Sequence, residues 1–175
     1  VSSETRLINL DDIDGKPLME VLSIYSGEPF DSPELIDNQT AILYYSSGTT
    51  GNPKLIEYTY RNMVTSQVSM VRAGYVNPFE KHLCVLPLGH TAALRHTIKP
   101  CICTASTVYL YESFWKIRNK IWNIVEQNRI NFFNIVPTIL IAMMNMPYSR
   151  FSMDQVRTMK FIACSSSFLP RKQQL

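Results

Sequence analysis

From residue 40 onward, short apolar runs alternate with amphipathic segments. The runs are rich in β-branched and aromatic residues, which favour strands, and the predicted strands are 40–45, 55–58, 82–86, 107–111, 131–136 and 160–164. Between them apolar residues recur at helical spacing, and the predicted helices are 60–72, 91–103, a helix after Ser113, and 137–146. Such alternation favours crossover units. We therefore predict an α/β fold with a mainly parallel sheet flanked by helices, and a hairpin at 40–58 as the exception.

Individual residues refine the helices. Thr59 can cap the helix at 60–72 and Gly74 can end it, while Pro100 predicts a break or kink within 91–103. Ser113 is the expected N-cap of the most strongly amphipathic helix. Its apolar stripe is expected to pack inward and consists of Phe114, Ile117, Ile121, Ile124 and Val125.

The two ends of the chain differ from its middle. Residues 1–38 contain prolines, acidic residues and only brief apolar runs, so we interpret them as a leading segment and linker. Residues 39–175 then form a partial domain. Because the chain stops at Leu175 shortly after a strand, without a closing element, we expect a longer parent protein.

Composition narrows the class of protein. Of 175 residues 46% are apolar, and the net charge of +3 is spread without runs of like charge, which argues against a nucleic-acid groove. The most apolar stretch, 135–146, contains Pro137 and is shorter than the roughly 20 residues that span a bilayer, so no membrane span is expected. Four cysteines in apolar surroundings indicate reduced thiols in a cytoplasmic protein.

The segment from Ser46 to Lys54, SSGTTGNPK, concentrates four hydroxyls, two glycines and a lysine. Glycines allow backbone amides to approach an anion, hydroxyls donate hydrogen bonds, and lysine adds a mobile positive charge, so the loop suits phosphate. The spacing differs from that of a Walker A loop, because Pro53 precedes the lysine and Leu55 follows it. An ordinary hairpin turn is the alternative interpretation.

The segment YSSGTTGNPK, Tyr45–Lys54, resembles the phosphate-loop signature of adenylate-forming enzymes, the superfamily of acyl-CoA and aryl-CoA ligases, beetle luciferases and peptide-synthetase adenylation domains. The order of later segments resembles the family too, over roughly residues 37–175. These segments are Thr59–Asn62, Leu86–His90, Ile135–Thr138 and Ala163–Pro170. The resemblance implies an internal fragment of the large N-terminal domain of such an enzyme.

The resemblance also implies a reaction. Family members activate a carboxylic acid with ATP and Mg²⁺ to an acyl-adenylate, and then transfer the acyl group to a thiol such as CoA. It implies catalytic roles for Lys54 and His90, and no metal ligand in this chain. The implied ATP phosphate-binding residues are Ser46, Ser47, Gly48, Thr49, Thr50, Gly51 and Lys54.

Two further site regions follow from the resemblance. His90, Thr91, Val136, Pro137 and Thr138 would line the acyl pocket, and the adenylate region would comprise Ser165, Ser166, Ser167 and Phe168. Because the segment 88–91 has no acidic residue to hold an amino group, an acyl or aryl acid is favoured over an amino acid. The alternatives are that His90 caps the helix starting near Thr91, and that Val136 and Pro137 belong to the core.

Some positions depart from the family pattern. Leu55 and Tyr60 replace a usual glycine and histidine, and Ser166 and Ser167 stand where the backbone usually lies against the nucleotide. They keep open a non-catalytic nucleotide-binding or scaffold relative. Because the family's metal-binding acid, ribose-binding Asp and lid lysine would lie past Leu175, we expect this fragment alone to be inactive.

A zinc site in a binding module is a second alternative. It would be formed by His90, His96, Cys101 and Cys103, whose spacing is poor for zinc.

Overall fold

The computed structural model describes residues 34–46, 54–146 and 152–169. The chain divides into two compact units, residues 1–35 and 36–175. Only residues 34 and 35 of the first unit are described, so the predicted leading segment at 1–38 lies almost wholly outside the described residues.

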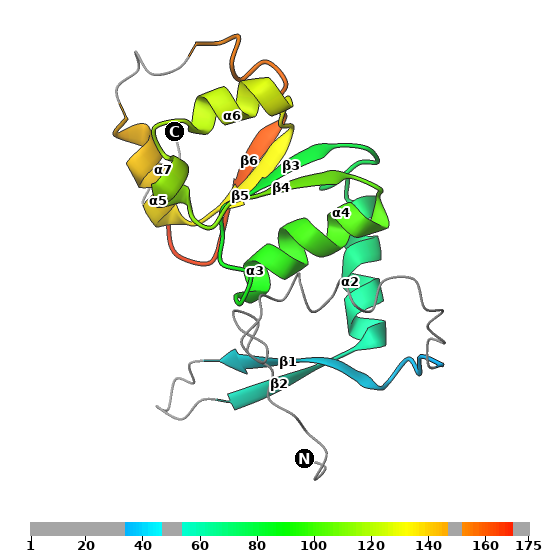
Figure 1. Cartoon of the computed structure of the whole chain (residues 1–175). Coiled ribbons are helices and arrows are strands. Elements are labelled where there is room, and N and C mark those ends of the chain that lie inside the picture. The colour runs from blue at the N-terminus through cyan, green and yellow to red at the C-terminus, as the bar shows by residue number, and fades with distance from the viewer. Residues whose placement is uncertain (1–33, 47–53, 147–151, 170–175) are drawn as a thin grey trace, which may run out of the picture. The chain divides into compact units, whose positions relative to one another are not determined.

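The predicted hairpin is confirmed. Strands β1 (Thr40–Ser46) and β2 (Lys54–Thr59) pair antiparallel and form a two-stranded sheet of their own. Ser46 and Lys54 are opposite each other at the end of the ladder. The hairpin therefore fixes both ends of the loop that was predicted to bind phosphate (Figure 1).

Helix α2 (Tyr60–Arg72) begins and ends where the sequence predicts. The Asn62 amide donates to Thr59 Oγ1 at 3.2 Å and the Thr59 amide donates to Asn62 Oδ1 at 3.2 Å, which completes a capping box. At the other end Gly74 adopts a left-handed φ of +71°, and the Tyr75 amide donates to the Met70 carbonyl at 3.0 Å. These are the bonds of a glycine-ended helix.

The main sheet has four parallel strands, as predicted: β3 (Lys81–Cys84), β4 (Thr107–Leu110), β5 (Phe132–Ile135) and β6 (Phe161–Cys164). Their order in the sheet is β4-β3-β5-β6. Strands β3 and β5 are therefore neighbours although β4 lies between them in sequence. Figure 1 shows helices on both faces of this sheet.

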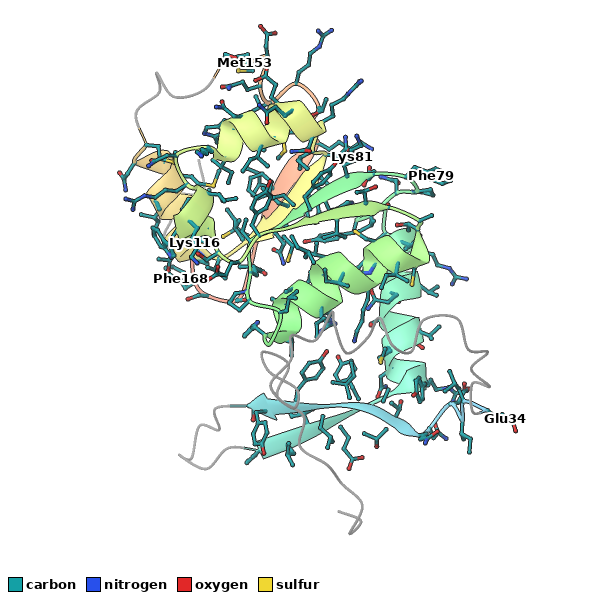
Figure 2. The ribbon with its side chains drawn as sticks, in the orientation of Figure 1. Glu34, Phe79, Lys81, Lys116, Met153 and Phe168 are labelled. Carbon is teal, nitrogen blue, oxygen red and sulfur yellow. The ribbon has the colours of Figure 1, made fainter. Side chains whose placement is uncertain are left out.

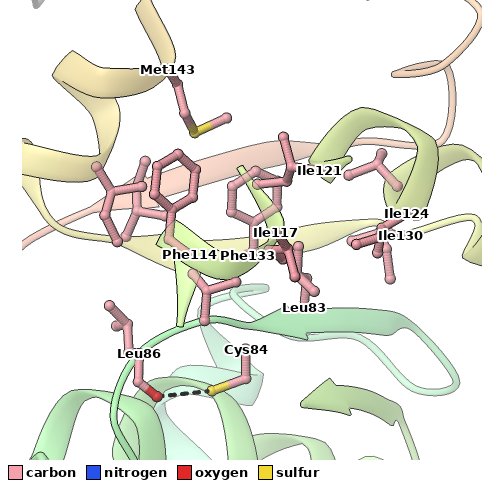
Figure 3. Close-up of a cluster of buried hydrophobic side chains, with 14 of the residues drawn as sticks. Leu83, Cys84, Leu86, Phe114, Ile117, Ile121, Ile124, Ile130, Phe133 and Met143 are labelled. Carbon is pink, nitrogen blue, oxygen red and sulfur yellow. Dashed lines mark hydrogen bonds between the residues drawn. The ribbon is translucent and has the colours of Figure 1, made fainter. Parts of the chain in front are cut away.

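One face of the sheet packs against α5 (Phe114–Ile117), α6 (Ile121–Asn128) and α7 (Pro137–Met144). The five residues of the predicted apolar stripe are all buried there. Figure 3 shows Phe114, Ile117, Ile121 and Ile124 of this stripe beside Leu83 and Phe133. Full burial of an aliphatic or Phe side chain contributes roughly 1.5–3 kcal/mol. This contact accounts for the largest part of the core.

The single helix predicted after Ser113 is wrong, because the structure has two. Lys120 leaves helical geometry, with φ −118° and ψ 1°, and its amide donates to the Ile117 carbonyl at 2.8 Å in a tighter turn. Asn119, before it, is a weak helix former. Ser113 makes no side-chain capping bond.

The opposite face packs against the helical segment 91–103, which contacts β3 and β5. It consists of α3 (Thr91–Ala93), the π-helical turn η1 (Leu94–Ile98) and α4 (Lys99–Cys103). Pro100 has no amide hydrogen to donate to the preceding turn, and the widened turn lies directly before it. The predicted irregularity near Pro100 is thus confirmed.

No helix in the described ranges combines the length and the apolar character needed to cross a bilayer.

Candidate functional site

A cavity of about 340 Å³ opens at the carboxyl ends of the parallel strands. Each of the four strands contributes residues from the segment that follows it. The lining residues are Val85, Leu86, Pro87, His90 and Ala92 after β3; Ser113, Phe114 and Trp115 after β4; Val136, Thr138 and Ile139 after β5; and Ser166 after β6. We call this the carboxyl-edge cavity.

The sheet order explains why the cavity lies there. The chain passes from β3 outward to β4, returns to β5 on the other side of β3, and continues outward to β6. The connections beyond β3 and β5 therefore diverge and leave a crevice between them. Open α/β sheets bind ligands at such a reversal of strand order.

His90 both lines this cavity and caps a helix. Its Nδ1 accepts a hydrogen bond from the Ala92 amide at 3.1 Å. A ring nitrogen that accepts carries no proton, so in the neutral ring Nε2 carries the hydrogen and can donate. His90 therefore caps the helix, as the alternative interpretation expects. The capping bond orients the ring and does not use the Nε2–H group, which can still donate to a ligand.

The segment after β5 divides its predicted residues between cavity and core. Val136 has an extended backbone and precedes α7, and it lines the cavity together with Thr138. Pro137 is buried in the first turn of α7 and is not among the lining residues. Thr91, also predicted for the acyl pocket, lines a different cavity.

Of the four residues predicted for the adenylate region, Ser166 alone lines the carboxyl-edge cavity. Its φ of +76° lies in the left-handed region, which glycine adopts at little cost and serine does not. Ser165 instead donates from its amide to the Ile135 carbonyl at 3.1 Å. Ser167 is exposed, and Phe168 projects beyond the carboxyl end of β6 with 79% of its surface exposed (Figure 2).

The predicted phosphate-binding residues are described only at the two ends of their loop. Ser47, Gly48, Thr49, Thr50 and Gly51 lie outside the described residues. Ser46 Oγ donates to the Lys54 carbonyl at 3.4 Å, and Lys54 is exposed.

Ser46 also lines a second cavity, of about 240 Å³, together with Thr91, Arg95 and Lys99. Because His90 and Ala92 line the first cavity, the two cavities lie against consecutive residues at the start of α3.

Ser113, Phe114 and Trp115 were missed as site residues by the sequence analysis. Their position directly after a predicted parallel strand could have indicated them, because carboxyl ends of parallel strands meet at one edge of a sheet. The pair Arg95 and Lys99 was missed as well. No local pattern in the sequence indicates that this pair lies near Ser46.

The residues of the zinc alternative offer poor ligands. Burial, with smaller contributions from the charges of Glu80 and Cys84, raises the pKa of the Cys101 thiol to about 12, so a thiolate there is disfavoured. Within the described ranges, no three His, Cys, Asp or Glu side chains come together as metal ligands.

A separate polar cluster lies at the amino ends of the strands, near Lys81 in Figure 2. Glu80 accepts from the Asn77 amide at 3.1 Å and from Asn77 Nδ2 at 2.9 Å, and it pairs with Lys160. Asn131 Oδ1 accepts from the Lys81 amide at 2.8 Å. The buried His82 ring lies beside the Glu80 carboxylate, with Nε2 at 3.4 Å from Oε2. We call this group the amino-edge cluster.

Comparison with known proteins agrees with this geometry. The sequence model for the AMP-binding enzyme family matches residues 3–173. The chain is 29% identical, over 79% of its length, to a marinolic acid–CoA ligase of Pseudoalteromonas, and 35% identical, over 59% of its length, to a 2-succinylbenzoate–CoA ligase of Bacillus pumilus.

Solved structures share the fold. The N-terminal domain of FACL13 from Mycobacterium tuberculosis gives a TM-score of 0.74 at 22% identity, covering 87% of this chain and 37% of that one. ATP-bound MatB from Rhodopseudomonas palustris gives 0.75 at 20% identity, covering 91% of this chain and 31% of that one. The chain spans 22% of the length of the marinolic acid–CoA ligase and 21% of the 2-succinylbenzoate–CoA ligase. With the family model matching nearly every residue, the chain belongs to the AMP-binding enzyme family.

Proposed function

We propose that this chain is part of a longer AMP-forming ligase, here called the parent ligase. The parent ligase activates a carboxylic acid with ATP to an acyl-adenylate and passes the acyl group to a thiol such as CoA. The observation that carries the proposal is the carboxyl-edge cavity, which is assembled from four segments at the reversal of strand order. The names of the relatives, marinolic acid–CoA and 2-succinylbenzoate–CoA ligase, support an acid and CoA as substrates.

The reaction requires alignment and charge stabilisation. A carboxylate oxygen of the acid attacks the α-phosphorus of ATP, and the bond to the departing pyrophosphate breaks as the new O–P bond forms. The thiol sulfur then attacks the acyl carbon, and AMP leaves. Because negative charge builds up on the phosphorus oxygens, donors fixed near them lower the barrier.

The chain offers two groups of donors for this purpose. The His90 ring, held by its bond from the Ala92 amide, keeps Nε2–H for an oxygen in the cavity. Lys54 and Ser46, at the ends of the loop, would hold the β- and γ-phosphates with Ser47, Gly48, Thr49, Thr50 and Gly51 between them. Val136 and Thr138 would contact the acyl group, and Ser166 the adenylate.

Magnesium would share the phosphate charge in such a reaction. No carboxylate is among the described residues that line the carboxyl-edge cavity, so these residues offer Mg²⁺ no carboxylate ligand. The metal ligands of the parent ligase would lie elsewhere in its sequence.

All four cysteines are free thiols, which supports a cytoplasmic location.

The test is acid-dependent exchange of pyrophosphate into ATP by the parent ligase, with His90 changed in two ways. His90→Asn keeps a good helix cap but removes the ring, whereas His90→Ala removes both. We expect both variants to lose exchange roughly 10²-fold or more, and the alanine variant alone to lose about 1 kcal/mol of stability. If His90→Asn exchanged pyrophosphate as fast as the unmodified parent ligase, His90 would serve only as a helix cap.

A second variant tests the phosphate loop. Lys54→Ala should weaken ATP binding and leave AMP binding and folding nearly unchanged, since an exposed lysine contributes little to stability. Equal losses for ATP and AMP would contradict the assignment.

A non-catalytic nucleotide-binding relative is the second candidate, favoured by the serine at the left-handed position 166. AMP binding by the parent ligase without any acid-dependent exchange would support that candidate.

A further inference from the structure

The second cavity, of about 240 Å³, has a wall that differs from that of the carboxyl-edge cavity. It lies between the hairpin, α2 and the helical segment 91–103, and its lining includes Arg95, Lys99, Tyr44, Tyr58 and Ser46. No aspartate or glutamate is among the described residues that line it. Two positive charges therefore face one cavity without a negative one.

In the part of the chain that the structure describes, these two cations have only neutral partners. Lys99 Nζ donates to the Tyr44 hydroxyl at 3.4 Å and lies 5.9 Å from the centre of the Tyr44 ring. Within the described ranges Arg95 has no carboxylate within ion-pair distance, and its side chain is exposed. Both side chains remain able to donate to an anion.

The polar neighbours of the cations suit an anion as well. The Tyr44 and Tyr58 rings meet edge to face with centres 5.6 Å apart, and hydroxyl groups can donate without adding charge. The amide oxygen of Gln67 in the same wall is unpaired, but it is fully buried and so is not accessible from the cavity.

The place and size of the cavity indicate which anion. Ser46 is the first residue of the loop whose composition suits phosphate, and it lies opposite Lys54 in the hairpin. The volume is roughly eight times that of a water molecule in the liquid, which is enough for a diphosphate. Arg and Lys are the residues that bind phosphate groups by fork geometry and by point charge.

We propose that Arg95 and Lys99 form an anion subsite that takes a diphosphate group beside the Ser46–Lys54 loop. The proposed function supplies two sources for this group: the pyrophosphate that leaves ATP, and the diphosphate of CoA. The identity of the source rests on the proposed function, whereas diphosphate binding itself can be measured without it.

The experiment is calorimetric titration of the 175-residue chain with inorganic pyrophosphate. The double variant Arg95→Gln with Lys99→Met should bind pyrophosphate roughly tenfold or more weakly, because two charge-assisted donors are lost. Arg157→Gln is the control, since Arg157 is an exposed arginine that precedes the amino end of β6. It should bind as the wild type does.

A second double variant separates the loss of charge from damage to the structure. Arg95→Lys with Lys99→Arg keeps both charges and should restore affinity to within about threefold of the wild type. The subsite would be overturned by a double variant that loses no more affinity than Arg157→Gln for either pyrophosphate or CoA, or by a rescue variant as weak as the neutral one for the ligand that is lost.

A parallel titration with CoA distinguishes the sources. Loss of pyrophosphate affinity in the neutral double variant assigns the subsite to the leaving group, and loss of CoA affinity alone assigns it to CoA. Binding of neither ligand to the wild-type chain overturns the proposal. A parent ligase without acid-dependent exchange, but with pyrophosphate binding that depends on Arg95 and Lys99, would sink the proposed function and leave the subsite standing.

Discussion

The two edges of the parallel sheet use polar residues differently. At the carboxyl edge His90, Thr138 and Ser166 line a cavity. At the amino edge Glu80, Asn131 and their partners bond to one another and to backbone groups. Among the described residues the His82 ring has no hydrogen-bond partner but is fully buried, and the other polar groups of the amino-edge cluster are bonded. The amino-edge cluster therefore stabilises the fold while the carboxyl edge remains available for chemistry.

The bonds of Asn131 show how the amino edge holds distant segments together. Its Oδ1 accepts from the Lys81 amide at 2.8 Å, and its Nδ2 donates to the Thr158 carbonyl at 3.1 Å. Thr158 Oγ1 in turn donates to the Ile130 carbonyl at 2.9 Å. One asparagine thus connects the starts of β3, β5 and β6. Substitutions at this edge should therefore lower the stability of the fold, and ligand binding should leave the edge unchanged.

The largest loss of stability is expected from a substitution in the hydrophobic core that packs against one face of the parallel sheet. Ile121 is fully buried, so Ile121→Asp would place an unpaired charge against Leu83 and Phe133 and cost roughly 4 kcal/mol or more. Denaturant unfolding measures it. Gln127→Glu, an exposed change of the same charge on α6, should cost less than about 0.5 kcal/mol. Similar losses in the two variants would contradict the packing described here.

Asn131→Ala should have the next largest effect, because it leaves a partly buried backbone amide and a partly buried carbonyl without their side-chain partner. We expect a loss of about 2 kcal/mol in the free energy of unfolding. Asn145→Ala is the matched control, since Asn145 makes one exposed bond to the Ile141 carbonyl. The comparison between edges would fail if Asn131→Ala changed ligand affinity without changing stability.

The amino-edge cluster should also make stability depend on pH. Burial raises the pKa of Glu80, but hydrogen bonds from Lys160 and Asn77 and the Lys160 charge outweigh it, so the pKa lies below its ordinary 4.5. Burial lowers the pKa of His82 below its ordinary 6.5, against the raising effect of the Glu80 carboxylate. Both groups therefore bind protons more weakly in the folded chain than in the unfolded one.

Stability should accordingly be greatest between pH 6.5 and 9.0, the ordinary pKa of the thiols that burial raises. It should begin to fall below 6.5 as the unfolded state takes up protons at histidine, and fall further below 4.5. Unfolding free energies across this range measure the effect. His82→Gln should reduce the slope below 6.5 and leave the part that comes from His96, whose pKa burial also lowers. A stability that rises on acidification would contradict the signs.

The smallest effect is expected at the carboxyl edge, where Ser166→Gly should stabilise the chain by about 1 kcal/mol. Glycine adopts the left-handed φ of +76° without the strain that serine experiences. Ser167→Gly is the control, because Ser167 is not at a positive φ and should gain nothing. Thermal unfolding compares the two, and equal changes would argue against strain at position 166.

Sequence patterns were sufficient for the four parallel strands, the hairpin and α2 with both of its ends. They were insufficient at Lys120, where one helix was predicted and two are present. Periodicity indicates which residues are buried, but not whether each backbone hydrogen bond follows the helical pattern. The same limit explains the site. Motif resemblance indicated His90, Val136, Thr138 and Ser166, whereas Ser113 and the pair Arg95 and Lys99 depend on which segments the fold brings together.

The most direct test of the difference between the edges is hydrogen–deuterium exchange of the parent ligase with and without a non-hydrolysable acyl-adenylate analogue. We predict slower exchange in peptides that cover 85–91, 136–140 and 165–168, which border the carboxyl-edge cavity. Peptides covering 77–81 and 158–160 of the amino-edge cluster should not change. Protection confined to the amino edge, or none at the carboxyl edge at saturating analogue, would contradict the account.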